Sequence, residues 1–350
     1  MTSETRGATA ALVAAMLFGF SAPCAKRLLA DTHPLLLSGL LYLGAGTGLL
    51  LLPSVATGVR TRAETPLRRG DLGTLLAIVG LGGILAPLLM LVGLIRVSGV
   101  VGALLLNLEA PLTMMLAVLL FHEHLGRRST AGAALIVLGV VILTARGGTG
   151  RADTWGVCAV AGACACWALD NNLTQRLSLR DPVAIARTKS LAAGACSVLL
   201  ALALGEHLPD ASALLAALLL GSISYGVSLV LAVQAMRLIG AARQAAFFAA
   251  APFVGALVAL PVLGERIGSH EIAAMLVLVA GVAVLVRDRH AHVHSHAGIE
   301  HEHGHVHDMH HRHEHAPGDP PGEPHAHGHR HESLTHEHPH SSDLHHRHPH

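Results

Sequence analysis

Two groups of polar residues interrupt otherwise apolar stretches of the sequence. Asn107 and Glu109 lie inside one apolar run, and Asp170, Asn171 and Asn172 lie inside another. A charged side chain at the centre of a bilayer costs roughly 2.5–3.5 kcal/mol on insertion scales, so one that is kept there usually faces a cavity or a partner. We therefore predict that the two acids line a central cavity and titrate or bind a cation, with the three asparagines completing a polar site. The alternative is that these groups hydrogen-bond between helices and fix their packing.

The end of the chain is a second region rich in residues that could do chemistry. Residues 290–350 hold 23 of the 28 histidines, many of them spaced His-x-His with acidic residues nearby. Neutral imidazole binds Zn, Ni, Co and Cu, and a flexible chain lets alternate rings converge on one ion. The predicted ligands are the first histidines of this segment: His292, His294, His296, His301, His303, His305, His307, His310, His311, His313 and His315.

The same tail has too little apolar material to offset the cost of ordering, and we predict that it is disordered. Metal binding is one interpretation of its role. A second is a pH-responsive polyelectrolyte: with 3 Arg against 9 Asp and Glu the tail carries −6, and protonating 23 histidines near a pKa of about 6.5 moves it towards +17. A third is an extension that binds metal only incidentally.

The elements that must position the buried acids are membrane helices. Residues 1–289 are dominated by Leu, Ala, Val and Gly in unbroken runs of about 20 residues, and such runs span a bilayer as helices because each satisfies its own backbone hydrogen bonds. The predicted fold is therefore an all-α integral membrane protein. Breaks at charged residues and Pro/Gly clusters give ten transmembrane helices, at residues 8–29, 35–57, 72–95, 98–121, 129–145, 154–176, 183–204, 212–236, 242–263 and 269–286.

The basic residues of the loops predict the orientation of these spans. With the N-terminus inside, 15 Lys and Arg lie on the inner side and six on the outer side. The positive-inside rule then places both the N-terminus and the histidine-rich tail in the cytoplasm. We expect a multi-pass protein of a bacterial-type cytoplasmic (inner) membrane.

An internal repeat divides the membrane domain. Residues 104–143 align with residues 246–285; Pro111 matches Pro252 and, with a shift of one residue between them, Glu123 matches Glu265. Each half has five helices, an odd number, so the second half is inserted upside down relative to the first. Inverted repeats of this kind build transporters with a substrate path between the halves. The predicted units are residues 1–145, residues 146–289 and the disordered tail 290–350.

These features resemble the ten-helix EamA family of the drug/metabolite transporter superfamily. An aromatic residue precedes a small one in the first helix of each half (Phe18-Gly19 and Trp167-Ala168), and a proline lies within each fourth helix. Leu-Gly-Glu-Arg-Ile closes that helix in the second half, whereas the first half reads Phe-His-Glu-His-Leu-Gly there. The resemblance implies a secondary transporter, commonly an exporter of metabolites or amino-acid-like solutes, that works by alternating access. It implies nothing about the tail.

For the other ionisable residues we favour structural roles. Lys189 is either a counter-ion within the membrane or a side chain that snorkels to the cytoplasmic surface, and we favour snorkelling. For Glu123 and Glu265, which lie at helix ends near arginines, we expect interfacial ion pairs in a structural role. Pro111 and Pro252 are predicted to be structural parts of the family motif.

The sequence leaves two principal functions open. The first is export of a small metabolite with a metal-binding tail, and the alternative is a divalent transition-metal transporter or metal-homeostasis membrane protein. A third possible function is that of a membrane-anchored metal buffer, but it leaves the repeat and the buried acids without a role. No nucleotide-binding loop or enzyme motif is present, so we expect no enzyme and no required cofactor. The expected partners are the lipid bilayer, a small-molecule or ion substrate and transition-metal ions, with no nucleic acid and an open oligomeric state.

Overall fold

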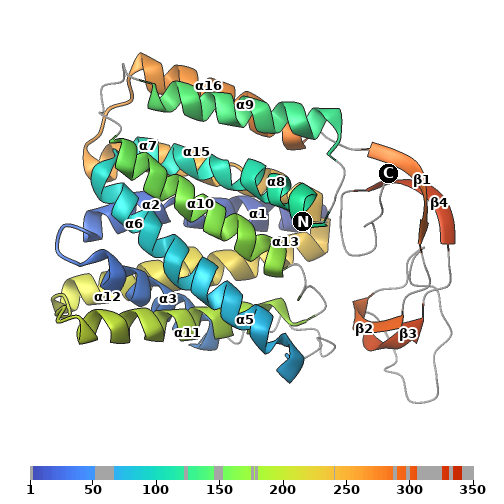
Figure 1. Cartoon of the computed structure of the whole chain (residues 1–350), viewed down its shortest axis with the longest axis horizontal. Coiled ribbons are helices and arrows are strands. Elements are labelled where there is room, and N and C mark those ends of the chain that lie inside the picture. Colours follow the sequence, from blue (N-terminus) through green and yellow to red (C-terminus); the bar gives the residue numbers. More distant parts are fainter. Residues whose placement is uncertain are drawn as a thin grey trace.

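A computed structural model gives the arrangement of the chain (Figure 1). Within the residues that the structure describes, the elements of the membrane domain are helices, as predicted, and the strands lie in the tail. The structure describes residues 3–51, 67–121, 125–145, 153–174, 177, 180–239, 241–286, 290–296, 300–305, 325–330 and 334–340.

All ten predicted spans are helical. In the first repeat the five spans are α1 (Ser3–Gly19) with α2 (Ser21–Leu28); α3 (Pro34–Leu51); η1 (Arg69–Asp71), α5 (Leu72–Ile78), η2 (Val79–Leu85) and α6 (Ala86–Arg96); α7 (Gly99–Leu105), η3 (Leu106–Leu108) and α8 (Glu109–Phe121); and α9 (Arg127–Thr144). In the second repeat they are α10 (Thr154–Thr174); α11 (Pro182–Ala203); α12 (Ala211–Gly221), η5 (Ser222–Val227) and α13 (Ser228–Ile239); α14 (Ala241–Phe248) with α15 (Ala251–Leu263); and α16 (Ser269–Val286). Within the described residues, eight helical stretches are long and apolar enough to cross a membrane, and α15 is a shorter apolar helix.

The third span of each repeat is widened at its middle. Both η2 and η5 are π-helical, and they occupy corresponding positions in the two halves. A π turn within an α-helix is rare and is found most often at functional sites. The hydrophobic pattern did not predict either segment, because one extra residue in a turn leaves an apolar run apolar.

The helices form an elongated bundle (Figure 1). The pair α9 and α16 lies side by side along one edge of the view, and α3 with α11 and α12 lies along the opposite edge. Between them, α1 packs on α13 and α15, and α10 packs on α6 and α8. Where α3 crosses α12, a Cβ added to Gly44 would lie 2.2 Å from the Leu218 carbonyl oxygen, and one added to Gly221 would lie 2.0 Å from that of Leu41. The backbones thus meet directly, as is common where membrane helices associate.

Two ends of the bundle are used as landmarks below. The "termini end" is where α1 begins and α16 ends, and the "far end" is where α6 meets α7. Large apolar side chains remain exposed along the outside, including Leu51, Leu119 and Leu199. Such a surface suits lipid and is uncommon on monomeric soluble proteins.

The tail contains two antiparallel strand pairs, β1 (His290–His296) with β4 (Leu334–His340) and β2 (Glu300–His305) with β3 (His325–Arg330). The His-x-His spacing of these segments has the two-residue period of a strand. The disorder of the tail as a whole stays a prediction. Five of the predicted metal ligands lie outside the described residues, namely His307, His310, His311, His313 and His315. Glu123 also lies outside them.

Candidate functional site

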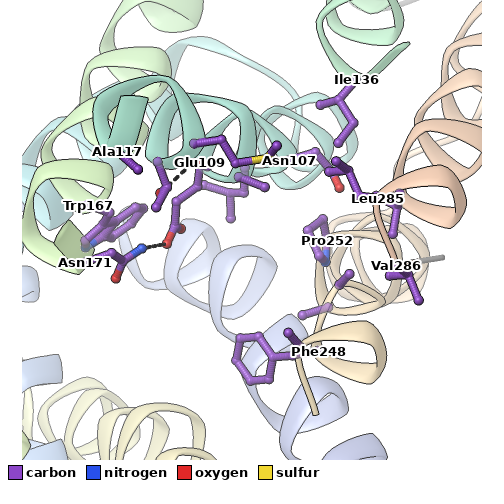
Figure 2. A pocket seen from close by; sticks show the side chains of 18 of the residues that line it. Asn107, Glu109, Ala117, Ile136, Trp167, Asn171, Phe248, Pro252, Leu285 and Val286 are labelled. Atoms are coloured by element: carbon purple, nitrogen blue, oxygen red, sulfur yellow. Dashed lines mark hydrogen bonds between the residues drawn. The ribbon is translucent and has the colours of Figure 1, made fainter. Parts of the chain in front are cut away.

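A cavity of about 780 Å³ lies within the bundle, lined by segments of both repeats (Figure 2). It collects four of the five predicted polar residues, Asn107, Glu109, Asn171 and Asn172. Pro252, one of the two motif prolines, also lines it. Helices from opposite repeats therefore bring together residues that are far apart in the sequence.

Glu109 is positioned by a break in its helix. It begins α8, directly after the 3₁₀ turn η3 that contains Asn107. Pro111 lacks an N–H and so cannot donate to the carbonyl four residues earlier, which is that of Asn107. The break places the Glu109 carboxylate, half-buried, at the cavity, where Oε1 accepts a hydrogen bond from Nδ2 of Asn171 at 2.7 Å (Figure 2).

The other two asparagines bind backbone. Asn172 Nδ2 donates to the Thr113 carbonyl at 3.1 Å and to the Ala168 carbonyl at 2.8 Å, which ties α10 to α8. Asn107 Nδ2 donates to the Leu104 carbonyl at 2.9 Å on its own helix. Both are buried. The alternative of hydrogen bonds between helices describes the Asn172 contact with Thr113, whereas the Asn107 bond stays within one helix. Both residues also line the cavity.

Asp170 lies behind the cavity and not in its lining. It forms a buried ion pair with Lys189, so the snorkelling prediction for Lys189 is wrong and the counter-ion interpretation is right. Lys189 lies about two turns into α11, and snorkelling would leave a buried carboxylate uncompensated. Gly82 makes room for the pair, because a Cβ there would lie 2.2 Å from the Asp170 carboxylate.

The π-helical segment η2 provides a second link between the repeats. The carbonyl of Gly82 accepts two hydrogen bonds, from the Tyr42 hydroxyl at 2.8 Å and from Nε1 of Trp167 at 3.1 Å. Tyr42 belongs to the first repeat and Trp167 to the second. The Trp167 ring is fixed in this way and also lines the cavity.

Aromatic side chains form a large part of the cavity wall, which sequence reasoning missed. Phe18, Trp167, Tyr225 and Phe248 are among its lining residues. The Phe18 ring is edge-on to Tyr225 at 5.6 Å between centroids and lies 5.2 Å from the ring of Phe248. The chain has only ten Phe, Trp and Tyr residues in all, and their scarcity was the one sequence signal that could have drawn attention to these four.

At the far end of the bundle two side chains cap helices. The Glu265 carboxylate accepts backbone N–H hydrogen bonds from Gly99 at 2.6 Å and Val100 at 2.9 Å, so it caps the first turn of α7. Nζ of Lys26 donates to the carbonyl of Leu94 at 2.5 Å and to that of Val97, at the end of α6. We predicted an ion pair between Glu265 and a neighbouring arginine, whereas the partner that the hydrogen bonds show is a helix N-terminus. An acid there interacts favourably with the unpaired N–H groups.

A surface ion pair lies beside these caps. Arg96 Nη1 donates to the Asp153 carboxylate at 2.9 Å, joining the end of α6 to the start of α10. This hydrogen bond, with one from the backbone of Trp155, lowers the pKa of Asp153 below its ordinary value. Both side chains are partly exposed, so the pair adds little stability.

The cavity runs from Glu109 towards the termini end. Its lining includes Gly126, directly before α9, and Val286, the last residue of α16. The two helix caps, Lys26 and Glu265, lie at the opposite end. The arrangement is a chamber of solute size, apolar over much of its wall, with one carboxylate among its described lining residues.

Comparison with known proteins agrees with this architecture. The sequence matches the model of the "EamA-like transporter family" over residues 5–145 and 154–287, which are the two repeats. An "Uncharacterized transporter" of Methanothermobacter thermautotrophicus is 30% identical over 294 residues, covering 78% of this chain and 84% of that protein. One solved crystal structure, 24% identical, superposes with a TM-score of 0.58 over 80% of this chain and 97% of the other, which shows a shared fold.

Proposed function

Because the chain belongs to the EamA-like transporter family, we propose that it exports a small metabolite or amino-acid-like solute through the central cavity by alternating access. The observation that carries the proposal is the cavity itself, which is lined by both inverted repeats and contains Glu109. Substrate sites of inverted-repeat transporters lie near the midplane, at the interface between the repeats. Rocking of one repeat against the other then exposes the same site to each side in turn.

Export is the proposed direction, and the orientation of the chain says which side the cavity faces. The loop charges favour cytoplasmic termini in a bacterial-type inner membrane. The termini end, to which the cavity extends, then faces the cytoplasm, and the two caps, Lys26 and Glu265, face outward. In this inward-facing state an exporter loads its solute and an importer releases it, so flux measurements decide the direction.

Glu109 is the group that we assign to coupling. Its carboxylate faces the cavity and has an uncharged partner, Asn171, so a proton or a cationic solute can neutralise it. Asp170 is already compensated by Lys189, and we assign that pair to holding α10 against α11 behind the site.

Flux into proteoliposomes tests this function. Purified protein is reconstituted with a pH gradient, and a panel of amino acids, amines and divalent metals is measured. Glu109→Gln is expected to abolish coupled flux of the transported solute, while Glu206→Gln, at an exposed carboxylate outside the cavity, leaves it unchanged. Normal flux in a correctly inserted Glu109→Gln protein would refute the assignment, and flux of divalent metal alone would favour the metal-transporter alternative.

For the tail we propose transition-metal binding, with a role as a cytoplasmic buffer or sensor. The strand register supports it, since His292 is opposite His338 and His294 is opposite His336. A protein truncated after Arg289 should bind fewer Zn and Ni ions by calorimetry and should alter cellular metal tolerance. Equal tolerance with and without the tail would exclude the cellular role.

A further inference from the structure

Among its described lining residues the cavity has four aromatic side chains and one acid, and this combination specifies a ligand. We infer that the cavity binds an organic monocation, a substituted ammonium whose charge lies at Glu109 and whose apolar part lies among Phe18, Trp167, Tyr225 and Phe248. This inference rests on the proposed function, because it names the solute class of the same cavity.

The composition of the cavity wall supports this class. The chain has ten aromatic residues in 350, yet four of them line this one cavity. They come from α1, α10, η5 and α14, so four separate elements of both repeats each contribute one ring. An ammonium or an organic cation placed over such rings is attracted by their negative faces, by about 2 kcal/mol or more when desolvated.

The charge of the wall points the same way. Of the described residues that line the cavity, Glu109 is the one with a formal charge. One of its oxygens accepts the Asn171 amide, which fixes the carboxylate without neutralising it. Figure 2 shows Trp167 beside this carboxylate and Phe248 across the open space from it. A single positive charge balances the described lining, and the rings supply aromatic surface in the same cavity.

Two other solute classes fit less well. A divalent transition metal favours several imidazole, thiolate or carboxylate ligands, whereas the described lining offers one carboxylate among apolar and amide groups. A zwitterionic amino acid needs a partner for its own carboxylate, and no Lys or Arg is present among the described lining residues. The volume of about 780 Å³ lies within the range of small-molecule sites.

Fluorescence of Trp167 tests the inference directly. Trp155 is 77% exposed on the outside of α10, so Trp155→Phe leaves Trp167 as the single tryptophan, inside the cavity. Full-length protein in detergent is titrated with phenethyltrimethylammonium, phenethylamine, phenylalanine, 2-phenylethanol and Zn²⁺. These organic probes share a phenyl ring and differ in charge.

We expect both cations to bind at least about tenfold more tightly than the neutral alcohol and the zwitterion. Glu109→Gln should abolish that preference. Phe18→Leu should weaken cation binding several-fold, while Phe20→Leu, which changes an exposed ring two residues away, should not. Tighter binding of phenylalanine, equal binding of the alcohol, or a Zn²⁺ response that depends on Glu109 would overturn the inference.

The equilibrium titration separates this inference from the proposed function. Cation binding without flux in proteoliposomes would contradict transport and leave the ligand class intact. Coupled flux of another solute, with no binding of either cation, would support transport and overturn the ligand class. A variant that unfolds is recognised by its circular dichroism and is replaced by Phe248→Leu, which alters a different ring of the same wall.

Discussion

The amide of Asn171 donates a hydrogen bond to the carboxylate of Glu109 across the boundary between the two repeats, at 2.7 Å. Neither residue has a counterpart of the same type in the other half, where Ala250 corresponds to Glu109. The contact therefore breaks the symmetry of the fold at the cavity. It couples the position of α10 to that of α8 and gives the acid one fixed orientation.

Removing this amide should weaken ligand binding. Hydrogen bonds to charged groups contribute about 1.5–3 kcal/mol, so Asn171→Ala is expected to raise the Kd for phenethylamine roughly tenfold or more. The measurement is the Trp167 titration in the Trp155→Phe background. Asn171→Gln, which keeps the amide on a longer stem, should recover part of the loss. A Kd within about twofold of the parent in Asn171→Ala would show that the contact does not position the acid.

The buried pair of Asp170 and Lys189 should behave as a unit. Removing one partner leaves an uncompensated charge, which costs about 3–5 kcal/mol, whereas removing both costs much less. Asp170→Asn and Lys189→Met are each expected to lower the Tm in detergent strongly. The double variant should be more stable than either single variant. Additive losses in the double variant would mean that the two side chains do not interact.

The cap on α7 predicts a stability effect far from the cavity. Glu265→Ala leaves the N–H groups of Gly99 and Val100 without their acceptor and should destabilise the protein by about 1–2 kcal/mol. Glu206→Gln is the matched control, because its contact with His33 is 3.7 Å long and exposed. Thermal unfolding in detergent compares the two. If they have equal effects, Glu265 is not a cap.

Two glycines in the same π-helical segment should differ sharply. A Cβ on Gly82 would lie 2.2 Å from the Asp170 carboxylate, whereas one on Gly80 meets nothing within 4 Å. Gly82→Ala is expected to displace the Asp170–Lys189 pair and lower the Tm by several degrees. Gly80→Ala should leave it unchanged or raise it, since alanine favours helix. Equal Tm values for the two variants would contradict the close approach at Gly82.

The sequence predicted the spans and part of the site, for identifiable physical reasons. Hydrocarbon thickness fixes the length of an apolar run, so the ten helices could be located from composition alone. Glu109 and Asn171 were recognisable because polar groups at membrane depth are costly. The partners of charged groups were not predictable in the same way. Lys189 and Glu265 each had arginines or the surface nearby in sequence, whereas their actual partners come from distant positions.

The aromatic wall shows a further limit of sequence reasoning. Phe18 and Trp167 were identified only as family features, and Tyr225 and Phe248 attracted no interpretation. Each lies on a different helix, and nothing in the local pattern says that four such rings face the same space. Their convergence depends on the angle at which each helix crosses its neighbours.

The π-helical segments η2 and η5 have an evolutionary consequence. A π turn holds one residue more than an α turn, so each segment is equivalent to a single-residue insertion in a membrane helix. Losing that residue would rotate every later side chain of the span by about 100° relative to the earlier ones. Alignments of relatives should therefore show one-residue gaps within residues 79–85 and 222–227 wherever the wide turn has been lost. Sequences with such a gap should also have changed the residues at positions 82 and 225. The carbonyl of Gly82 would no longer point to Trp167, and the ring of Tyr225 would no longer point to Phe18.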